Sequence, residues 1–324
     1  MRRRHLLQAA LALPFAAASA ARAQDSGKRH RIGLLMVGTA GGTGNVPVFF
    51  DGMRELGYVE GRNLVIERRF AATDDALEGL ARELVKLDVE VIVAGGPTAT
   101  RAARAATSTV PIVMGTHDPV EQGLIASLAR PGGNVTGWCV LSVDSASKQF
   151  ALLKEAVPRL ARVGLIANPQ MAAHATRIGH LTAAARELGL QVVPIEVSSR
   201  EAIAPGFAAM RRERVDAFTV IPEPQLDAMA GEIVKHAADQ RLPGLYTWKL
   251  YVNAGGLMSY GPSLPAMMRL WAPYVDKILR GTRPGDLPVE TPRKYELVLN
   301  QRAAHALGFT FPSALLLAAD EVMT

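Results

Sequence analysis

Residues 89–100, Val-Glu-Val-Ile-Val-Ala-Gly-Gly-Pro-Thr-Ala-Thr, are the stretch that decides the fold. The first six form an apolar run rich in β-branched residues, which is typical of a strand buried on both faces of a sheet. Gly95 and Gly96 permit backbone angles that other residues resist, and Pro97 suits the first position of a helix. The stretch therefore predicts a strand, a glycine turn and a helix.

The same turn is a candidate binding site. Thr98 and Ala99 stand at the predicted helix start, whose free N–H groups attract anions such as carboxylates, and Gly96 of the preceding turn is a candidate site residue with them. In open α/β sheets, ligands collect at the carboxyl ends of strands, where this turn would lie. The competing interpretation is a structural turn without a ligand, because helix starts are common and binding sites are few.

Strands and helices alternate on both sides of this unit. Two doubly wound, parallel-sheet lobes around a ligand cleft are therefore predicted, with the chain crossing between them near Leu141. We expect one lobe from residues 31–141 plus 263–285 and the other from residues 142–262 plus 286–324. Further strands are predicted over residues 31–37, 63–70, 111–115, 134–140, 162–167, 191–197, 217–221, 244–248, 256–260 and 295–299, and helices include residues 48–56, 74–87, 120–128, 147–157, 263–279 and 302–307.

Residues 1–23 have the composition of an export signal. Three arginines precede a short alanine-rich apolar stretch, and residues 21–23, Ala-Arg-Ala, have the form of a cleavage site. We expect cleavage near Ala23 and a mature chain in the periplasm. Residues 3–7 resemble a twin-arginine signal, and a plain secretory signal is the alternative.

Charge and cysteine content restrict the class of protein. The chain has 36 basic and 30 acidic residues, but four arginines lie in residues 1–23, so the mature chain carries 32 and 30, a net charge of +2. Such a small charge gives little support for a nucleic-acid partner. Cys139 is the only cysteine, so no internal disulfide can form, and its apolar surroundings indicate a buried, inert thiol.

No motif for a cofactor, a metal or covalent catalysis stands out. The sequence has no phosphate-binding loop, no nucleophile elbow and no zinc-protease motif, and its histidines do not cluster. The loop at residues 38–44 has two of the glycines of a dinucleotide fingerprint, but Pro47 replaces the third. We therefore expect no cofactor, no metal and no catalytic residue. Thr39 would line the cleft, unless the loop simply links a strand to a helix.

Polar and aromatic residues recur at other strand ends. Asp118 could reach a ligand amine or cap the following helix, and Asn168 and Glu223 could bind a ligand or serve turn chemistry. Tyr246 and Tyr260 could form an apolar wall, with core packing as the alternative. Because such residues occur in both predicted lobes, they favour a site between the lobes.

Several blocks resemble a known family. Residues 50–63, Phe-Asp-Gly-Met-Arg-Glu-Leu-Gly-Tyr-Val-Glu-Gly-Arg-Asn, resemble a segment of ABC-transporter substrate-binding proteins of the tryptophan/tyrosine type. The resemblance implies a type I periplasmic-binding fold, a solute ligand and a membrane permease as partner. The loop at residues 38–44 and Gln170-Met171 depart from the family pattern, which leaves the ligand open. Further matching blocks are residues 92–100, 118–120, 130–137, 255–261, 294–300 and 306–308.

The leading hypothesis is an exported, monomeric solute-binding protein of an ABC importer and not an enzyme. It would close its lobes on a small organic ligand, such as an amino acid or another carboxylate. The alternatives are a periplasmic ligand sensor for a receptor and an exported α/β enzyme that uses the same cleft.

Overall fold

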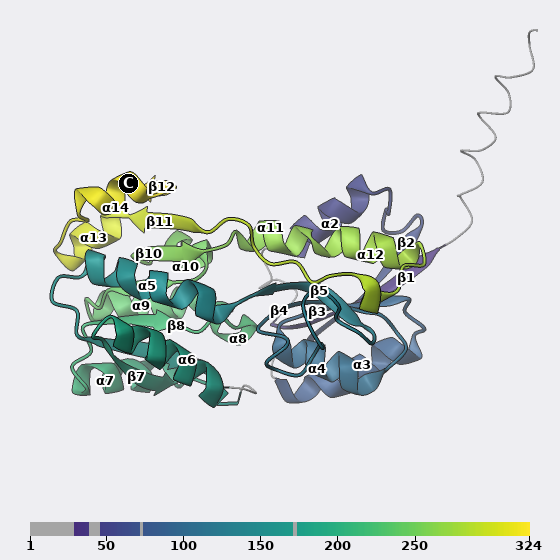
Figure 1. The fold of residues 1–324 in the computed structure, drawn as a ribbon, viewed down its shortest axis with the longest axis horizontal. Coiled ribbons are helices and arrows are strands. Elements are labelled where there is room, and N and C mark those ends of the chain that lie inside the picture. The colour runs from purple at the N-terminus through teal and green to yellow at the C-terminus, as the bar shows by residue number, and fades with distance from the viewer. Residues whose placement is uncertain (1–28, 39–45, 72–73, 171–173) are drawn as a thin grey trace, which may run out of the picture.

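The computed structural model describes residues 29–38, 46–71, 74–170 and 174–324. Two sheets form two lobes that lie side by side along the long axis of the molecule (Figure 1). The predicted export signal and Thr39 lie outside the described residues. Among the described residues, no helix has the length and apolar character needed to span a membrane.

The N-terminal lobe is built on a five-stranded parallel sheet with the order β2-β1-β3-β4-β5. All residues of β3, β4 and β5 are buried. β3 and β4 are central strands covered on both faces, and the free edge of β5 bonds to Glu290. The strands are β1 (His30–Val37), β2 (Leu64–Ala71), β3 (Val91–Gly95), β4 (Ile112–His117) and β5 (Val135–Val140).

Helices cover both faces of this sheet. The 3₁₀ turn η1 (Asp74–Ala76) leads into α3 (Leu77–Lys86), which packs beside α4 (Pro97–Ala106) on one face. The other face carries α2 (Val46–Glu55), α11 (Leu264–Arg269) and α12 (Trp271–Leu279) (Figure 1). The predicted strand-turn-helix unit is confirmed, because β3 ends at Gly95 and α4 begins at Pro97.

The C-terminal lobe has a seven-stranded sheet with the order β12-β11-β10-β9-β8-β6-β7. Only the β10–β11 pair is antiparallel. Its strands are β6 (Arg162–Ala167), β7 (Gln191–Glu196), β8 (Ala217–Val220), β9 (Gly244–Tyr246), β10 (Met258–Gly261), β11 (Glu296–Asn300) and β12 (Glu321–Met323). Its helices are α5 (Ser142–Ala156), α6 (His174–Glu187), α7 (Ile203–Arg212), α8 (Pro224–Asp227), α9 (Ala230–Asp239), α10 (Lys249–Asn253), α13 (Gln301–Leu307) and α14 (Ser313–Ala318).

Three chain segments connect the lobes: β5 to α5, β10 to α11, and the 3₁₀ turn η2 (Pro284–Asp286) to β11. The third crossing follows residue 290, because Val289 N donates to Leu128 O at 2.8 Å and Cys139 N donates to Glu290 O at 2.9 Å. Residues 287–290 thus lie on the N-terminal sheet. The predicted division at residue 286 stays a prediction, and these contacts favour a boundary a few residues later.

Some predicted elements are wrong in detail. The expected helix over residues 120–128 is a series of turns, because Gly123 has a φ of 65° and Ala126 N bonds to Pro131 O instead of continuing a helix. Asp118 therefore has no helix to cap. The expected helix over residues 263–279 is divided at Leu270 into α11 and α12, and α5 begins five residues earlier than predicted.

Candidate ligand-binding site

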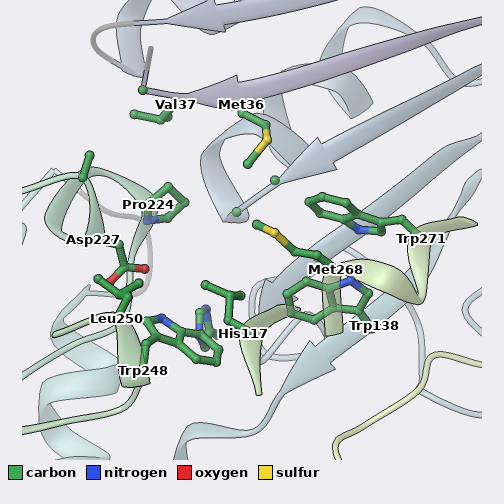
Figure 2. Close-up of a pocket in the computed structure, with 16 residues that line it drawn as sticks. Met36, Val37, His117, Trp138, Pro224, Asp227, Trp248, Leu250, Met268 and Trp271 are labelled. Carbon is green, nitrogen blue, oxygen red and sulfur yellow. The ribbon is translucent and has the colours of Figure 1, made fainter. Parts of the chain in front are cut away.

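A cavity of about 360 Å³ lies between the lobes. Its size falls within the range of about 300–1,000 Å³ typical of small-molecule sites. The carboxyl ends of β1, β3 and β4 face α8 and α10 of the C-terminal lobe across it, and α11 lines it beside the N-terminal sheet. Figure 2 shows Met268 of α11 beside Trp138 and Trp271. The lining residues are Met36, Val37, Gly38, Gly95, Gly96, Gly115, His117, Trp138, Pro224, Asp227, Ala228, Trp248, Leu250, Leu264, Met268 and Trp271.

All three tryptophans of the chain line this cavity. Trp138 and Trp271 lie on one side, with ring centroids 5.8 Å apart and ring planes 33° apart (Figure 2). Gly115 makes this pair possible, because a Cβ there would lie 2.4 Å from Cζ2 of Trp138 and 2.8 Å from Cζ2 of Trp271. Trp248 comes from the C-terminal lobe, and its ring centroid lies 6.1 Å from that of His117. The cavity is thus mainly aromatic and apolar.

The two lobes touch beside the cavity at Gly96 and Pro224. Gly96 has a φ of 89°, and a Cβ there would lie 2.7 Å from Cγ of Pro224. Thr98 and Ala99 line a crevice with Pro224 and Gln225 that leaves no room for a water molecule. The start of α4 therefore faces a contact between the lobes, with Gly96 alone of its three predicted site residues on the cavity wall.

Asp227 and His117 are the two titratable side chains that line the cavity among the described residues. The Tyr251 hydroxyl donates a hydrogen bond to Oδ1 of Asp227 at 3.0 Å. Burial raises the pKa of Asp227 well above its usual range, and the charge of Glu223 raises it further. Burial and the nearby charge of Arg177 lower the pKa of His117 well below 6.5, so the imidazole is neutral at pH 7. Among the described residues, neither ring nitrogen of His117 has a hydrogen-bond partner.

A buried polar cluster adjoins the cavity. Asn168 Nδ2 donates to Oε1 of Glu223 and to Oε1 of Gln225, both at 2.8 Å. Across the lobe boundary, Arg177 Nε lies 3.9 Å from Oδ2 of Asp118, and both side chains are under 10% exposed. The structure thus brings together three predicted site residues, Asp118, Asn168 and Glu223, but none of them lines the cavity.

The two predicted tyrosines lie away from the cavity wall. Tyr246 stacks on Tyr251 in the core, with ring centroids 4.5 Å apart and planes 5° apart. Tyr260 stacks on Tyr295 at 5.7 Å. The alternative of core packing therefore describes Tyr246 well.

Sequence reasoning missed Trp138, Trp271 and Asp227. Trp138 lies in the interior of a predicted strand and Trp271 in a predicted helix, where an aromatic residue usually indicates core packing. Asp227 ends α8, a helix of four residues with no clear periodic signal. The rarity of tryptophan was the one available signal. Among the described residues, no group of three or more His, Cys, Asp or Glu side chains is placed to hold a metal ion.

A cavity between two α/β lobes that three chain segments connect defines a two-lobed binding protein of the type I periplasmic-binding architecture. Residues 43–323 match the family model described as ABC transporter substrate binding protein, and the chain therefore belongs to this family. The resemblance found in the sequence is thereby confirmed.

Three relatives illustrate the match. The chain is 26% identical over 269 residues to a tyrosine-binding protein of Clostridioides difficile (strain R20291), covering 82% of this chain and 77% of that protein. It superposes with a TM-score of 0.85 on a conserved domain protein from Vibrio cholerae O1 biovar El Tor strain N16961, at 26% identity and covering 91% and 100% of the two chains. A structure described as the ABC domain in complex with L-Trp from Streptococcus pneumonia gives a TM-score of 0.84 at 24% identity, with the same coverage, and supports the fold.

Proposed function

We propose that this chain captures a small organic solute outside the cytoplasm and delivers it to an ABC importer. The observation that carries the proposal is the tryptophan-lined cavity between the lobes, in a chain that belongs to the substrate-binding family. Its size and apolar wall suit a solute with a flat, apolar body. The tyrosine-binding relative agrees with such a ligand.

Binding would proceed by closure of the two lobes about the three connecting segments. Contacts that cross the lobe boundary favour the closed arrangement: the Arg177–Asp118 pair and His180 Nδ1, 3.5 Å from Oε1 of Glu121. A solute that fills the cavity touches both lobes, so it binds the closed form better than the open form and shifts the equilibrium. The closed form would then be presented to the permease.

We further propose that the chain is exported and acts as a single molecule. Residues 1–23 would direct export to the periplasm and be removed near Ala23, and the mature chain would act as a monomer without a cofactor. The polar cluster of Asp118, Asn168 and Glu223 would hold the lobes in register around the solute. The solute would leave the site chemically unchanged.

Native mass spectrometry of the protein purified from the periplasm tests this proposal. We expect a non-covalent small-molecule mass on the wild-type chain. The Gly96→Ala variant should lose that mass, because the new Cβ meets Pro224 as the lobes close.

Gly57→Ala is the matched control for this experiment. Gly57 has a φ of 91°, so alanine causes similar backbone strain there, but nothing lies within 4 Å of the new Cβ. It should retain the bound mass. A wild-type chain without any bound mass, or equal retention by both variants, would contradict the proposed site.

A further inference from the structure

Asp227 is an acidic side chain that lines the cavity and has no counter-ion among the described residues. It accepts a hydrogen bond from a neutral donor, the Tyr251 hydroxyl at 3.0 Å, and the neighbouring charge that acts on it is the negative charge of Glu223. Among the ion pairs of the described residues, none includes Asp227. A carboxylate withdrawn from water is unfavourable unless a cation pairs with it, which is why burial raises the pKa of Asp227. An ammonium group of a ligand would supply the cation that the described residues do not, and would stabilise the charged carboxylate.

The remainder of the wall also suits a positive charge. Trp248 lies beside Asp227, and Trp138 and Trp271 lie on the other side of the cavity (Figure 2). The faces of indole rings attract ammonium groups, most strongly where water is excluded. Met36, Met268, Leu250 and Leu264 complete an apolar surround.

Among the described residues, the cavity offers an anion hydrogen-bond donors, the unpartnered Nε1 groups of Trp138, Trp248 and Trp271, but no cationic partner. Among the described residues that line it, none is a lysine or an arginine. Residues 39–45, which follow the lining residue Gly38, contain no basic residue in the sequence. Arg177, the buried cation nearby, already faces the charges of Asp118, Glu223 and Glu121.

The expected carboxylate site at the start of α4 is also obstructed. Pro224 lies against Gly96, and the crevice at Thr98 has no room for a water molecule. A ligand carboxylate would therefore lose its water without gaining a cationic partner, which is unfavourable. A ligand amine would instead gain an ionic partner on binding, because Asp227 has no counter-ion among the described residues.

We infer that the solute is an organic cation, an amine on a flat apolar body that carries no carboxylate, with its ammonium group at Asp227 between the indole rings. This inference rests on the proposed function and narrows its ligand class. The sequence suggested a ligand carboxylate. The inferred ligand group at this site has the opposite charge.

Isothermal titration calorimetry with three probes that share an indole ring tests the inference. Tryptamine is a cation, tryptophan a zwitterion and indole-3-propionate an anion at pH 7. We expect tryptamine to bind at least tenfold more tightly than tryptophan, and indole-3-propionate to bind most weakly. The Asp227→Asn variant should weaken tryptamine binding by roughly thirtyfold or more, because it removes one partner of a desolvated charge pair.

Asp239→Asn is the matched control. Asp239 is an exposed residue of α9 that pairs with Lys235 at 2.7 Å and does not line the cavity, so its substitution should leave tryptamine binding unchanged. Circular dichroism of both variants serves as the check that they are folded.

The inference is overturned if tryptamine fails to bind, if tryptophan or indole-3-propionate binds as tightly, or if Asp227→Asn binds tryptamine as the wild type does. The failure of the proposed function has a different signature. A carboxylic acid found as the co-purified mass would overturn the amine and leave solute binding intact, whereas a chain that carries no solute mass at all would contradict solute binding itself.

Discussion

Gly115 is the residue where the smallest change should have a large effect. Its replacement by alanine places a Cβ 2.4 Å from Cζ2 and 2.6 Å from Cε2 of Trp138, and 2.8 Å from Cζ2 of Trp271. Carbon atoms pack favourably at about 3.5–4.0 Å, so the Trp138 ring has to move by about 1 Å. Trp138 is 3% exposed and Trp271 is 0% exposed, and the cavity that both rings line offers space into which the Trp138 ring can move.

The expected loss of stability follows from overpacking. Added methyl groups in well-packed surroundings typically cost about 1–3 kcal/mol in the free energy of unfolding. At about 2–4 °C for each kcal/mol in lobes of this size, Tm should fall by about 2–12 °C. Because the displaced indole enters the cavity, binding of the co-purified solute should weaken as well.

Thermal unfolding followed by circular dichroism measures this effect, with Gly79→Ala as the control. Gly79 lies on the exposed face of α3, and nothing lies within 4 Å of its added Cβ. Alanine there should raise the stability by about 0.5–1 kcal/mol, because glycine is a poor helix former. If Gly115→Ala unfolds at the wild-type temperature or above it, the packing argument is wrong.

Three further predictions concern ionisation of buried groups. The pKa of His117 is lowered in the folded protein. Below pH 6.5 the imidazole is therefore protonated in the unfolded chain but not in the folded chain, and the free energy of unfolding falls as the pH drops. His117→Gln should reduce the loss of Tm between pH 7 and pH 5, and an unchanged loss would contradict the assignment. The pKa of Asp227 is raised, so stability falls as the pH rises from 3.8 through the folded-state pKa. Without a ligand, Asp227→Asn should therefore unfold at a higher temperature than the wild type at pH 7, and a lower temperature would show that the carboxylate is stabilised. Burial raises the pKa of Cys139 to about 12. A maleimide at pH 7.5 should label this thiol only after denaturation, as measured by mass spectrometry, and rapid labelling of the native chain would contradict its burial.

The architecture could be predicted because its signals are local. The run of β-branched residues before Gly95 and the proline after Gly96 fix β3 and α4 without help from the remainder of the chain. The error at residues 120–128 arose because the apolar spacing resembles a helix, whereas the positive φ of Gly123 depends on how the turn packs. The antiparallel pairing of β11 with β10 also depends on contacts between segments far apart in the sequence.

The site was predictable only as a region. The rule that ligands meet strand ends led to Gly96 and to the neighbourhood of His117, both of which line the cavity. It missed Trp138 and Trp271. Trp138 lies inside β5 and Trp271 in α12, and these two elements become neighbours only when α12 packs on the N-terminal sheet. The role of Asp227 depends on the absence of a counter-ion around it, which no local pattern shows.

The position of the three indoles has a practical consequence for optical measurements. With no tryptophan elsewhere in the sequence, the tryptophan emission, excited at wavelengths that the six tyrosines do not absorb, originates at this cavity. The wavelength and intensity of this emission should therefore change when water or a solute enters the cavity, without a contribution from distant parts of either lobe. The protein carries its own unlabelled reporter, suited to stopped-flow work with solutes that do not themselves emit.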